Sequence, residues 1–293
     1  QAWESGGFEA EGTYETNFWP SGVVPFEFDG NVSAANRTAA TTAMARWENI
    51  AGVDFRQCAN NACTGDFVHI QSSASANNSP VGRRGGRQVI NIVSWGSNII
   101  IAHELGHTLG LEHEQSRTDR GTWVTINSAN ICKATDASCN GGFCFNGSGN
   151  RIDCDFNFNI VNGSRTYGNY DFDSLMHYGR TAFSRNGSDT ITVNAPNNTY
   201  WQSRIGQRDH LSVADTNVMR CMYPFANWRW ASVGGSFLNV GTCRAPYAGL
   251  ALGVGLTPNF GTLWLETGNY GGVGTYSKPM TLRAPNGTAV IGR

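Results

Sequence analysis

Apolar side chains recur every three or four positions in three segments of the chain, the spacing that places them on one face of an α-helix. Ser33 can cap the first segment, and Ser97 or Asn98 can cap the second, because short polar side chains accept hydrogen bonds from the first turn of a helix. Pro224 follows the third segment and cannot continue a helix. We therefore expect helices over residues 33–50, 99–110 and 212–223.

Shorter stretches alternate between apolar and polar residues, which predicts β-strands. Residues 121–200 show little periodicity and are rich in Gly, Asn and Ser, so we expect irregular structure there. Residues 1–18 predict an extended N-terminal arm, and residues 226–293 predict a small Gly-rich β module after a boundary near residue 225. The expected strands are residues 23–28, 53–55 and 67–70, with a turn and then a strand over 82–93.

The composition excludes some classes of partner. Charged residues make up 15% of the 293 residues, against about 25% in an average soluble domain, and the formal net charge is −1. Such a chain does not attract phosphate backbones globally, so we expect no nucleic-acid partner. No apolar run approaches the roughly 18–20 residues that cross a bilayer, so we expect no membrane span.

Eight cysteines give an even count, and four of them fall within residues 132–154. This density in a Gly- and Asn-rich segment favours a loop held by disulfide bonds, and therefore an oxidising compartment. Eight free buried thiols are the alternative. The sequence cannot choose among the possible connectivities. Plausible pairs are Cys58–Cys63, Cys139–Cys144 nested within Cys132–Cys154, and Cys221–Cys243.

The strongest chemical signal is the run HELGH at residues 103–107, followed by Gly110 and His113. His103 and His107 are four positions apart, so on a helix both imidazoles reach one point. Gly110 can adopt a left-handed conformation that ends the helix and brings His113 back towards the same point. Three imidazoles suit Zn²⁺ and leave a fourth position for water, which is typical of a catalytic zinc site.

Glu104 follows the first of these histidines and is not expected to bind the metal. A carboxylate at this position can take a proton from water at the metal and pass it to a leaving amine. We therefore predict that Glu104 is the general base and acid of a hydrolytic reaction. The alternative is a surface helix that carries these residues by chance.

The residues around this run resemble a known signature. Residues 103–120 (HELGHTLGLEHEQSRTDR) are similar to the zinc-binding signature of the astacin family of metzincin metalloproteases. Glu114 narrows the resemblance from metzincins to astacins, as do Arg117, Asp119 and Arg120. We expect these three charges to pair with one another or with neighbouring loops, and a solvated charge run is the alternative. Four further segments agree, at residues 19–26, 81–89, 174–178 and 205–223, so that the similarity covers roughly residues 19–224.

The resemblance implies roles for single residues. Residues 174–178 (SLMHY) are similar to the family's Met-turn, in which Met176 would form an apolar floor beneath the three imidazoles. Tyr178 matches a tyrosine that ligates zinc in the empty site and donates its hydroxyl to the developing oxyanion. Glu114 matches a glutamate that meets the mature N-terminus. The arm before Trp19 is longer than in a mature astacin but lacks an F-x-G-D inhibitory pattern, so we interpret the chain as an active form.

The same resemblance implies the fold and the function. We expect an α+β metzincin fold of two lobes, with a twisted mixed sheet plus helices, an active-site cleft between the lobes, and a small C-terminal β module. Residues 19–225 would be the protease domain. The implied function is a secreted, zinc-dependent endopeptidase that hydrolyses protein or peptide substrates. The oligomeric state does not follow from the sequence.

Residues 82–93 resemble the family's edge strand above the cleft, with which an extended peptide could pair through main-chain hydrogen bonds. The arginines of this segment could favour acidic substrate side chains, or they could be ordinary solvent-facing cations. These are Arg83, Arg84 and Arg87. Three other histidines lack a partner at metal-binding spacing and are expected to be structural or exposed, namely His69, His177 and His210.

The C-terminal segment allows other interpretations. Residues 262–270 and 280–292 faintly resemble the opening rungs of parallel β-helix proteins, but two rungs could not bury a solenoid core alone. We therefore expect a compact module packed on the protease. Two other functions stay open: a zinc hydrolase with a narrow non-peptide amide substrate, and a binding or adhesion protein with a vestigial zinc site. The intact Glu104 favours the protease.

Overall fold

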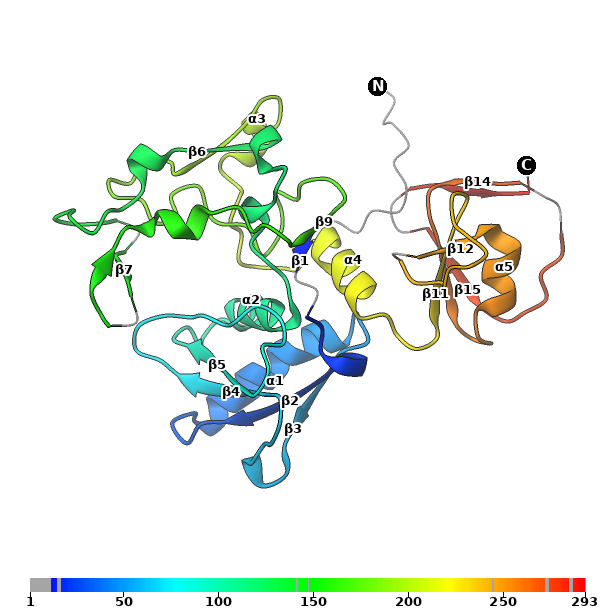
Figure 1. Ribbon diagram of the computed structural model, residues 1–293, viewed down its shortest axis with the longest axis horizontal. Coiled ribbons are helices and arrows are strands. Elements are labelled where there is room, and N and C mark those ends of the chain that lie inside the picture. The colour runs from blue at the N-terminus through cyan, green and yellow to red at the C-terminus, as the bar shows by residue number, and fades with distance from the viewer. Residues whose placement is uncertain are drawn as a thin grey trace.

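The chain forms two lobes and a C-terminal module, which are seen in Figure 1 as a lower lobe, an upper lobe and a separate unit on the right. We call residues 17–110 the N-lobe, residues 111–212 the C-lobe and residues 226–292 the C-terminal module. The computed structural model describes residues 12–14, 17–140, 142–146, 148–243, 245–271, 274–284 and 287–292. The expected contact between Glu114 and the start of the chain lies outside this description.

A four-stranded sheet forms the base of the N-lobe, in the order β3-β2-β4-β5, with all four strands parallel. Strand β2 buries Val24, Phe26 and Phe28 and turns the residues between them outward, which is the period of two that the sequence predicts. The strands are β2 (Val23–Phe28), β3 (Asp54–Gln57), β4 (Phe67–Ser72) and β5 (Arg87–Ile92).

Two long helices pack against each other and against this sheet to form the main core. They are α1 (Ala34–Glu48) and α2 (Asn98–Leu109). The Trp47 indole of α1 donates a hydrogen bond to the Ala102 carbonyl of α2 at 2.9 Å. Of the two candidate caps for α2, Ser97 accepts the hydrogen bond from Ile100 N–H, and Asn98 is the first helical residue.

Strand β5 is not the edge that faces the cleft, contrary to our expectation for residues 82–93. Asn78 exchanges two main-chain hydrogen bonds with Asn91 of β5 in the antiparallel sense, at 3.0 and 2.9 Å. The Asn77 side chain accepts two further main-chain hydrogen bonds just beyond β5. Residues 77–81 therefore cover the free side of β5. The run N-N-S carries no apolar alternation, which is why the sequence did not reveal this edge.

The C-lobe is irregular, as its Gly-, Asn- and Ser-rich sequence predicts. Three two-stranded antiparallel pairs, β1–β9, β6–β10 and β7–β8, surround a second core centred on Phe158, Tyr170 and Phe172. The elements are β1 (Gly12–Tyr14), β6 (Val124–Ile126), β7 (Cys144–Phe145), β8 (Arg151–Ile152), β9 (Arg165–Tyr167), β10 (Ile191–Val193) and the short helix α3 (Asn198–Trp201). Helix α4 (Val213–Met222), which the sequence predicts, then returns to the N-lobe core and is capped by Ser212.

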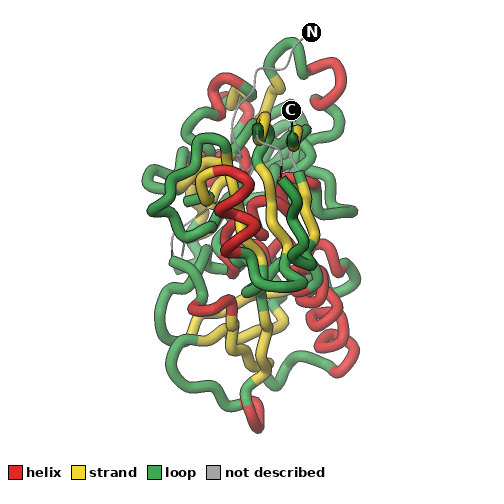
Figure 2. Tube along the Cα trace, turned by 90° about the vertical axis from the view of Figure 1, so that its right-hand side faces the viewer, coloured by secondary structure: helices red, strands yellow, loops and turns green. Residues whose placement is uncertain are grey.

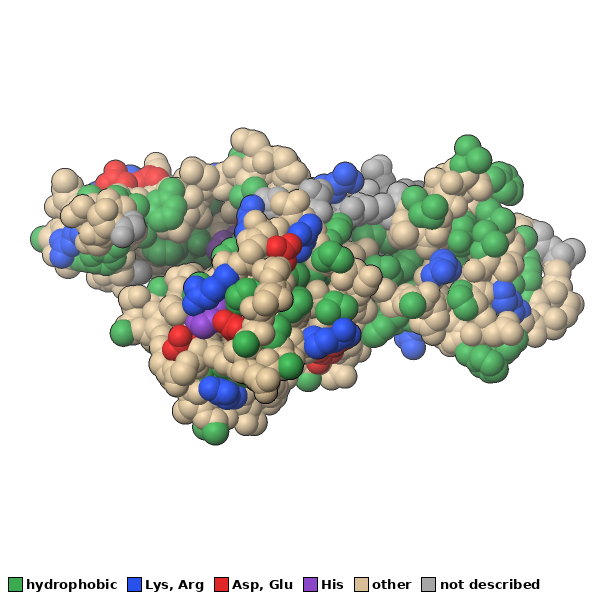
Figure 3. Space-filling view, turned by 60° about the horizontal axis from the view of Figure 1, so that its bottom comes forward, with side chains coloured by type: hydrophobic (Ala, Val, Ile, Leu, Met, Phe, Trp, Pro, Cys, Tyr) green, Lys and Arg blue, Asp and Glu red, His purple; other side chains and the backbone are tan. Residues whose placement is uncertain are grey.

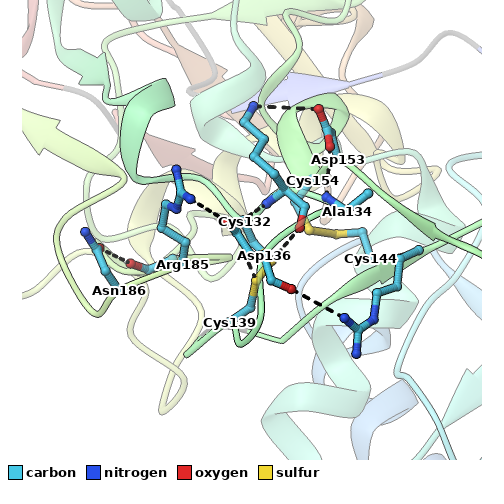
Figure 4. The surroundings of a disulfide bond; sticks show 12 residues. Cys132, Ala134, Asp136, Cys139, Cys144, Asp153, Cys154, Arg185 and Asn186 are labelled. Atoms are coloured by element: carbon cyan, nitrogen blue, oxygen red, sulfur yellow. Dashed lines mark hydrogen bonds and ion pairs between the residues drawn. A yellow bond between two sulfur atoms is a disulfide. The ribbon is translucent and has the colours of Figure 1, made fainter.

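All eight cysteines form disulfide bonds, so the alternative of free thiols is wrong. The pairs Cys58–Cys63 and Cys221–Cys243 are those expected. Within residues 132–154 the pairing is sequential instead of nested. Figure 4 shows the two bonds, Cys132–Cys139 and Cys144–Cys154. The hairpin of β7 and β8 explains the difference, because it pairs Cys144 of β7 with Ile152 of β8 and so brings Cys144 close to Cys154, two residues after the strand.

The C-terminal module is built on parallel strands that Figure 2 shows side by side. One sheet has the order β12-β11-β13-β15, and β14 pairs with β16 in a second. The parallel pairs β13–β15 and β14–β16 have the arrangement of successive rungs. The strands are β11 (Trp228–Ser232), β12 (Tyr247–Ala248), β13 (Thr262–Leu265), β14 (Gly268–Tyr270), β15 (Thr281–Arg283) and β16 (Ala289–Ile291).

The module also contains a helix, α5 (Gly249–Leu256), which our expectation of a purely β module missed. Its sequence, GLALGVGL, is apolar or glycine at every position, so it shows no polar face and no period. Gly253 explains how α5 fits, since a Cβ there would lie 2.9 Å from the Cβ of Ala231 in β11. The helix packs on the parallel sheet through its buried residues Leu250, Gly253 and Val254, while Leu256 at its end is exposed.

The module packs on the N-lobe, as expected for a compact appendage. Trp230 and Trp264 are almost fully buried, with their rings stacked 6.1 Å apart, and both belong to the main core of the N-lobe. The bond between Cys221 of α4 and Cys243 links the two parts covalently. Figure 3 shows acidic and basic side chains interspersed on the face that it draws. Among the described residues, no helix has the length and apolarity needed to cross a membrane.

Candidate metal centre and active site

Helix α2 carries two of the three predicted zinc ligands on its buried side. His103 and His107 are 7% and 5% exposed, with ring centroids 4.7 Å apart. The helix ends at Gly110, whose φ of 114° lies in the left-handed region that favours glycine. The N–H groups of Gly110 and Leu111 bond back to the last turn, which reverses the chain. This reversal brings the ring of His113 to 4.4 Å from that of His107.

The ligand nitrogens of the three histidines converge within 4.8 Å of one another, as predicted. The carbonyl of Leu175 lies 3.0 Å from His103 Nδ1, and that of Leu111 lies 2.7 Å from His107 Nδ1. Because a carbonyl only accepts, both Nδ1 atoms carry the proton, and each Nε2 keeps its lone pair for a metal. Nε2 of His107 lies 3.1 Å from Nε2 of His113.

This donor set fits Zn²⁺. Burial lowers the pKa of all three imidazoles, to about 4 for His107, so the rings are neutral at pH 7, as metal ligands must be. Tetrahedral coordination at about 2.1 Å places ligand nitrogens roughly 3.4 Å apart, close to the His107–His113 separation. A second cluster among the described residues, at Cys132, Asp136 and Cys139, cannot do the same because its two sulfurs form a disulfide.

The Met-turn passes beneath α2, where Met176 is 2% exposed. A Cβ on Gly106 would lie 3.1 Å from Met176 Sδ and 3.3 Å from the Trp47 ring. Glycine at this position therefore lets the Met-turn approach the helix that carries the histidines. Sequence reasoning gave Gly106 no role, although it lies inside the zinc-binding run.

Asp215 holds the Met-turn from the first turn of α4. Its carboxylate accepts hydrogen bonds from Ser174 Oγ at 2.7 Å and from Leu175 N–H at 2.8 Å, and it also caps α4 through Ser212 N–H at 3.0 Å. Since the Leu175 carbonyl orients His103, α4 fixes a ligand histidine in two steps. Sequence reasoning missed Asp215. The signal was present as the capping pattern S-x-x-D at the start of α4.

Glu104 is buried beside the triad, and burial raises the pKa of its carboxyl to about 8. The guanidinium of Arg208 acts in the opposite direction and lowers that pKa. Arg208 also lowers the pKa of the three histidines, so it lies within electrostatic reach of the whole site. It donates a hydrogen bond to the His177 carbonyl at 3.0 Å. Sequence reasoning did not identify Arg208.

Tyr178 lies next to the third histidine, with its ring centroid 4.3 Å from that of His113. Phe158 packs against the tyrosine ring at 5.8 Å, edge to face. The main-chain N–H of Tyr178 donates to Gln115 Oε1 at 3.0 Å. Burial and the nearby Glu104 carboxylate raise the pKa of Tyr178 well above 10, so its hydroxyl stays protonated at neutral pH.

A cavity of about 340 Å³ joins these groups at the boundary between the lobes. The N-lobe contributes the edge segment 77–81 and helix α2, and the C-lobe contributes residues from three separate loops. The arginines considered for substrate contacts do not line it, and Arg83 forms an ion pair with Asp66 at 2.5 Å. The lining residues are Asn77, Asn78, Ser79, Val81, His103, Glu104, His107, Glu112, His113, Asn157, Tyr178 and Phe183.

The signature residues beyond the third histidine form a buried charge cluster. Arg117 is 1% exposed and donates to Glu114 at 3.2 Å and to both carboxylate oxygens of Asp119 at 2.8 Å. It also donates to the carbonyls of Gly168 and Asn169. Burial raises the pKa of Glu114, and Arg117 opposes this shift. As expected, these charges pair with one another and with a neighbouring loop.

The remaining histidines do not join the triad. His177 is fully buried between the hydroxyl of Tyr170 at 2.8 Å and the carbonyl of Tyr178 at 2.7 Å, which leaves no nitrogen for a metal. His69 lies between two carboxylates on the sheet, and His210 pairs with two carboxylates at the surface.

Comparisons with known proteins agree with this geometry. The sequence model of the astacin peptidase family matches residues 11–140 and 150–224. A bone morphogenetic protein 1 homolog of Strongylocentrotus purpuratus is 31% identical over 216 residues, which is 70% of this chain and 30% of the relative. Human Tolloid-like protein 2 is 33% identical over 213 residues, 70% of this chain and 18% of the relative.

Two further relatives extend this picture. The zinc metalloproteinase nas-14 of Caenorhabditis elegans is 31% identical over 72% of this chain and 38% of its own length. The chain therefore spans less than half the length of these curated relatives. The solved structure of high choriolytic enzyme 1, a hatching-enzyme zinc protease of medaka, aligns with a TM-score of 0.55 and 30% identity, covering 70% of this chain and 93% of that structure. This chain belongs to the astacin family of zinc-dependent metallopeptidases.

Proposed function

We propose that the chain is a secreted endopeptidase that hydrolyses peptide bonds of protein substrates in the cavity between its lobes. The observation that carries the proposal is the convergence of His103, His107 and His113 with the buried carboxyl of Glu104 on one cavity. Four disulfide bonds support an oxidising, extracellular location. We also propose residues 19–225 as the peptidase domain and residues 226–293 as an appended module.

His103, His107 and His113 would hold the zinc ion through their Nε2 atoms. When bound, zinc polarises the substrate carbonyl and lowers the pKa of water. Glu104 then acts as general base and takes the proton from the attacking water. It passes this proton to the nitrogen of the breaking amide, so that the product leaves as a neutral amine.

Tyr178 donates its hydroxyl to the oxygen that gains negative charge during attack. Its raised pKa supports this role, because the proton is retained at neutral pH. Its position beside His113 also allows it to serve as a further ligand in the absence of substrate. The antiparallel edge at residues 77–81 orients an extended peptide through main-chain hydrogen bonds, which explains how many sequences could be bound.

A single substitution tests the proposal. Glu104→Gln removes the base at nearly constant size, and we expect it to lose about 100-fold or more in kcat on casein or gelatin while retaining about one zinc per chain. Glu112→Gln removes the other carboxylate that lines the cavity and shows which acid is the base. Loss of activity in the second variant alone would overturn the role of Glu104. A peptide library separates an endopeptidase from a hydrolase of one non-peptide amide.

A further inference from the structure

Asn157 stands on the C-lobe side of the active-site cavity and has no role in the mechanism above. It belongs to the 3-10 turn Cys154–Phe158, which follows the β7–β8 hairpin. The family model leaves out residues 141–149 of this hairpin, so the loop is a part of the site in which this chain departs from the family pattern.

The hydrogen bonds of Asn157 fix the direction of its side-chain amide. The Nδ2 group donates to the carbonyl of Cys154 at 3.1 Å and contacts Cys144 Sγ at 3.3 Å. A carbonyl only accepts, so the amide nitrogen must face Cys154 and the flipped assignment is excluded. Within the described part of the chain, Oδ1 has no hydrogen-bond partner. A half-buried acceptor is therefore held at the cavity wall without a donor.

The loop beneath Asn157 is held on several sides. The Cys144–Cys154 bond, drawn in Figure 4, ties β7 to the first residue of this turn, and the Asn157 amide contacts Cys144 Sγ. Arg120 donates to the carbonyl of Phe158, and the Phe158 ring packs on Tyr178. An acceptor on such a supported turn keeps its direction, which is what a binding contact requires.

An extended substrate needs an acceptor on this side. Successive residues of an extended peptide direct their N–H and C=O groups to opposite edges. Residues 77–81 can satisfy one edge, and the other edge faces the C-lobe wall. Of the other C-lobe side chains that line the cavity, Tyr178 is committed to the developing oxyanion and Phe183 offers no polar atom. His113 is a predicted zinc ligand, and Glu112 is already engaged in another interaction. Asn157 offers a fixed carbonyl.

We propose that Asn157 is a substrate-binding residue whose Oδ1 accepts a hydrogen bond from one main-chain N–H of the bound peptide, next to the scissile bond. This inference rests on the proposed endopeptidase function. The contact is independent of the substrate's side chains, so it strengthens binding of extended peptides in general. The disulfide Cys144–Cys154 positions the acceptor and takes no part in the reaction.

The test combines two changes at the same hydrogen bond. Asn157→Leu removes the acceptor at similar size, and Asn159→Leu, at an exposed position two residues on, is the matched control. The substrate is a peptide that the wild type cleaves, with each non-scissile N–H replaced in turn by an ester oxygen. We expect one ester position to cost the wild type about five- to tenfold in kcat/KM. The same ester should cost Asn157→Leu nothing further.

Two readouts and a second variant keep the outcomes apart. Zinc content and melting temperature show whether the variant has kept its fold, and Asn157→Ser provides a second, smaller change. The inference is overturned if every ester position costs Asn157→Leu as much as it costs the wild type, or if this variant keeps kcat/KM within about twofold of the wild type on the parent peptide. Zinc-loaded wild type that cleaves no peptide would instead overturn the proposed function, and the inference with it.

Discussion

Single polar atoms with a fixed direction determine the chemistry of this site. The carbonyls of Leu175 and Leu111 set the tautomers of His103 and His107, and so decide which nitrogens face the metal. Arg117 illustrates the same rule for charge, because its buried guanidinium is tolerated only with two carboxylates and two carbonyls around it. Residue types come from the sequence, but their directions come from the groups that surround them.

Protonation of His210 should make the stability depend on pH. Hydrogen bonds to the carboxylates of Asp173 and Asp209 raise its pKa above the ordinary 6.5. A raised pKa means that the folded chain holds this proton more tightly, so the added stability is complete below pH 6.5 and is lost as pH rises through the folded value. We expect His210→Gln to unfold at a lower temperature than the wild type at pH 6 and at the same temperature at pH 9.

The exposure of His210 limits the size of the expected stability difference. Because the side chain is about half exposed, the difference at pH 6 should stay below about 1 kcal/mol. Melting curves of both zinc-loaded proteins over this pH range measure it. A difference that grows as pH rises would show that the carboxylates do not stabilise the protonated ring.

At the scale of elements, the ends and glycines of helices connect distant parts of the chain. The capping carboxylate of α4 also binds the Met-turn, so one hydrogen-bonding group serves two elements. Within α2, Gly106 creates the room that the Met-turn occupies, and Gly110 ends the helix where the third histidine must turn back. These contacts explain why the zinc-binding run needs glycine at two of its positions.

Gly106→Ala tests the packing of α2 on the Met-turn. Alanine favours the helix by about 1 kcal/mol, but its Cβ would press on Met176 and Trp47, and overfilling a packed core costs about 1–3 kcal/mol. We expect a net loss of about 1 kcal/mol, measured by chemical denaturation with zinc content followed in parallel. Gly96→Ala, where nothing lies within 4 Å of the added carbon, is the control. If Gly106→Ala were more stable than the wild type, the packing of Met176 and Trp47 against this position would have room for the added methyl group.

At the scale of the whole molecule, the site lies where separate units meet. The N-lobe supplies the sheet edge and α2, the C-lobe supplies Tyr178 and Asn157, and α4 ties the two together. The C-terminal module joins the same core through Trp230 and Trp264. The parallel rungs of the module therefore bury part of their apolar surface against the N-lobe. This is how two rungs, which could not bury a core alone, are accommodated.

Removal of the Cys221–Cys243 bond should loosen the module. A loop of 22 residues closed by a disulfide is worth about 3 kcal/mol in the chain-entropy account. We expect the double serine variant, made in the Glu104→Gln background to prevent self-digestion, to be cut by trypsin within residues 226–293 many-fold faster than its parent. The matching variant of Cys58 and Cys63 should leave that rate unchanged. Equal rates in all three proteins would mean that the tryptophan packing alone holds the module.

Much of the site followed from local pattern. The spacing of His103 and His107 and the reversal at Gly110 follow from helix geometry, which depends on neighbours a few positions apart. The same reasoning failed for the sheet edge at residues 77–81 and for α5, because a polar edge and a uniformly apolar helix leave no period to detect. It also failed for the disulfides within residues 132–154, whose pairing depends on a hairpin.

By itself, therefore, the sequence determined the three helices α1, α2 and α4, the zinc-binding histidines, the candidate base Glu104 and the resemblance to astacins. Each of these depends on residues that lie close together along the chain. Tertiary structure decided which groups surround them. Asp215, Arg208 and Asn157 lie between 44 and 112 residues along the chain from the triad of His103, His107 and His113, and only folding brings them to the site. Contacts between residues far apart in the sequence leave no periodic pattern of side chains along the chain. This is the physical reason that only the tertiary structure reveals them.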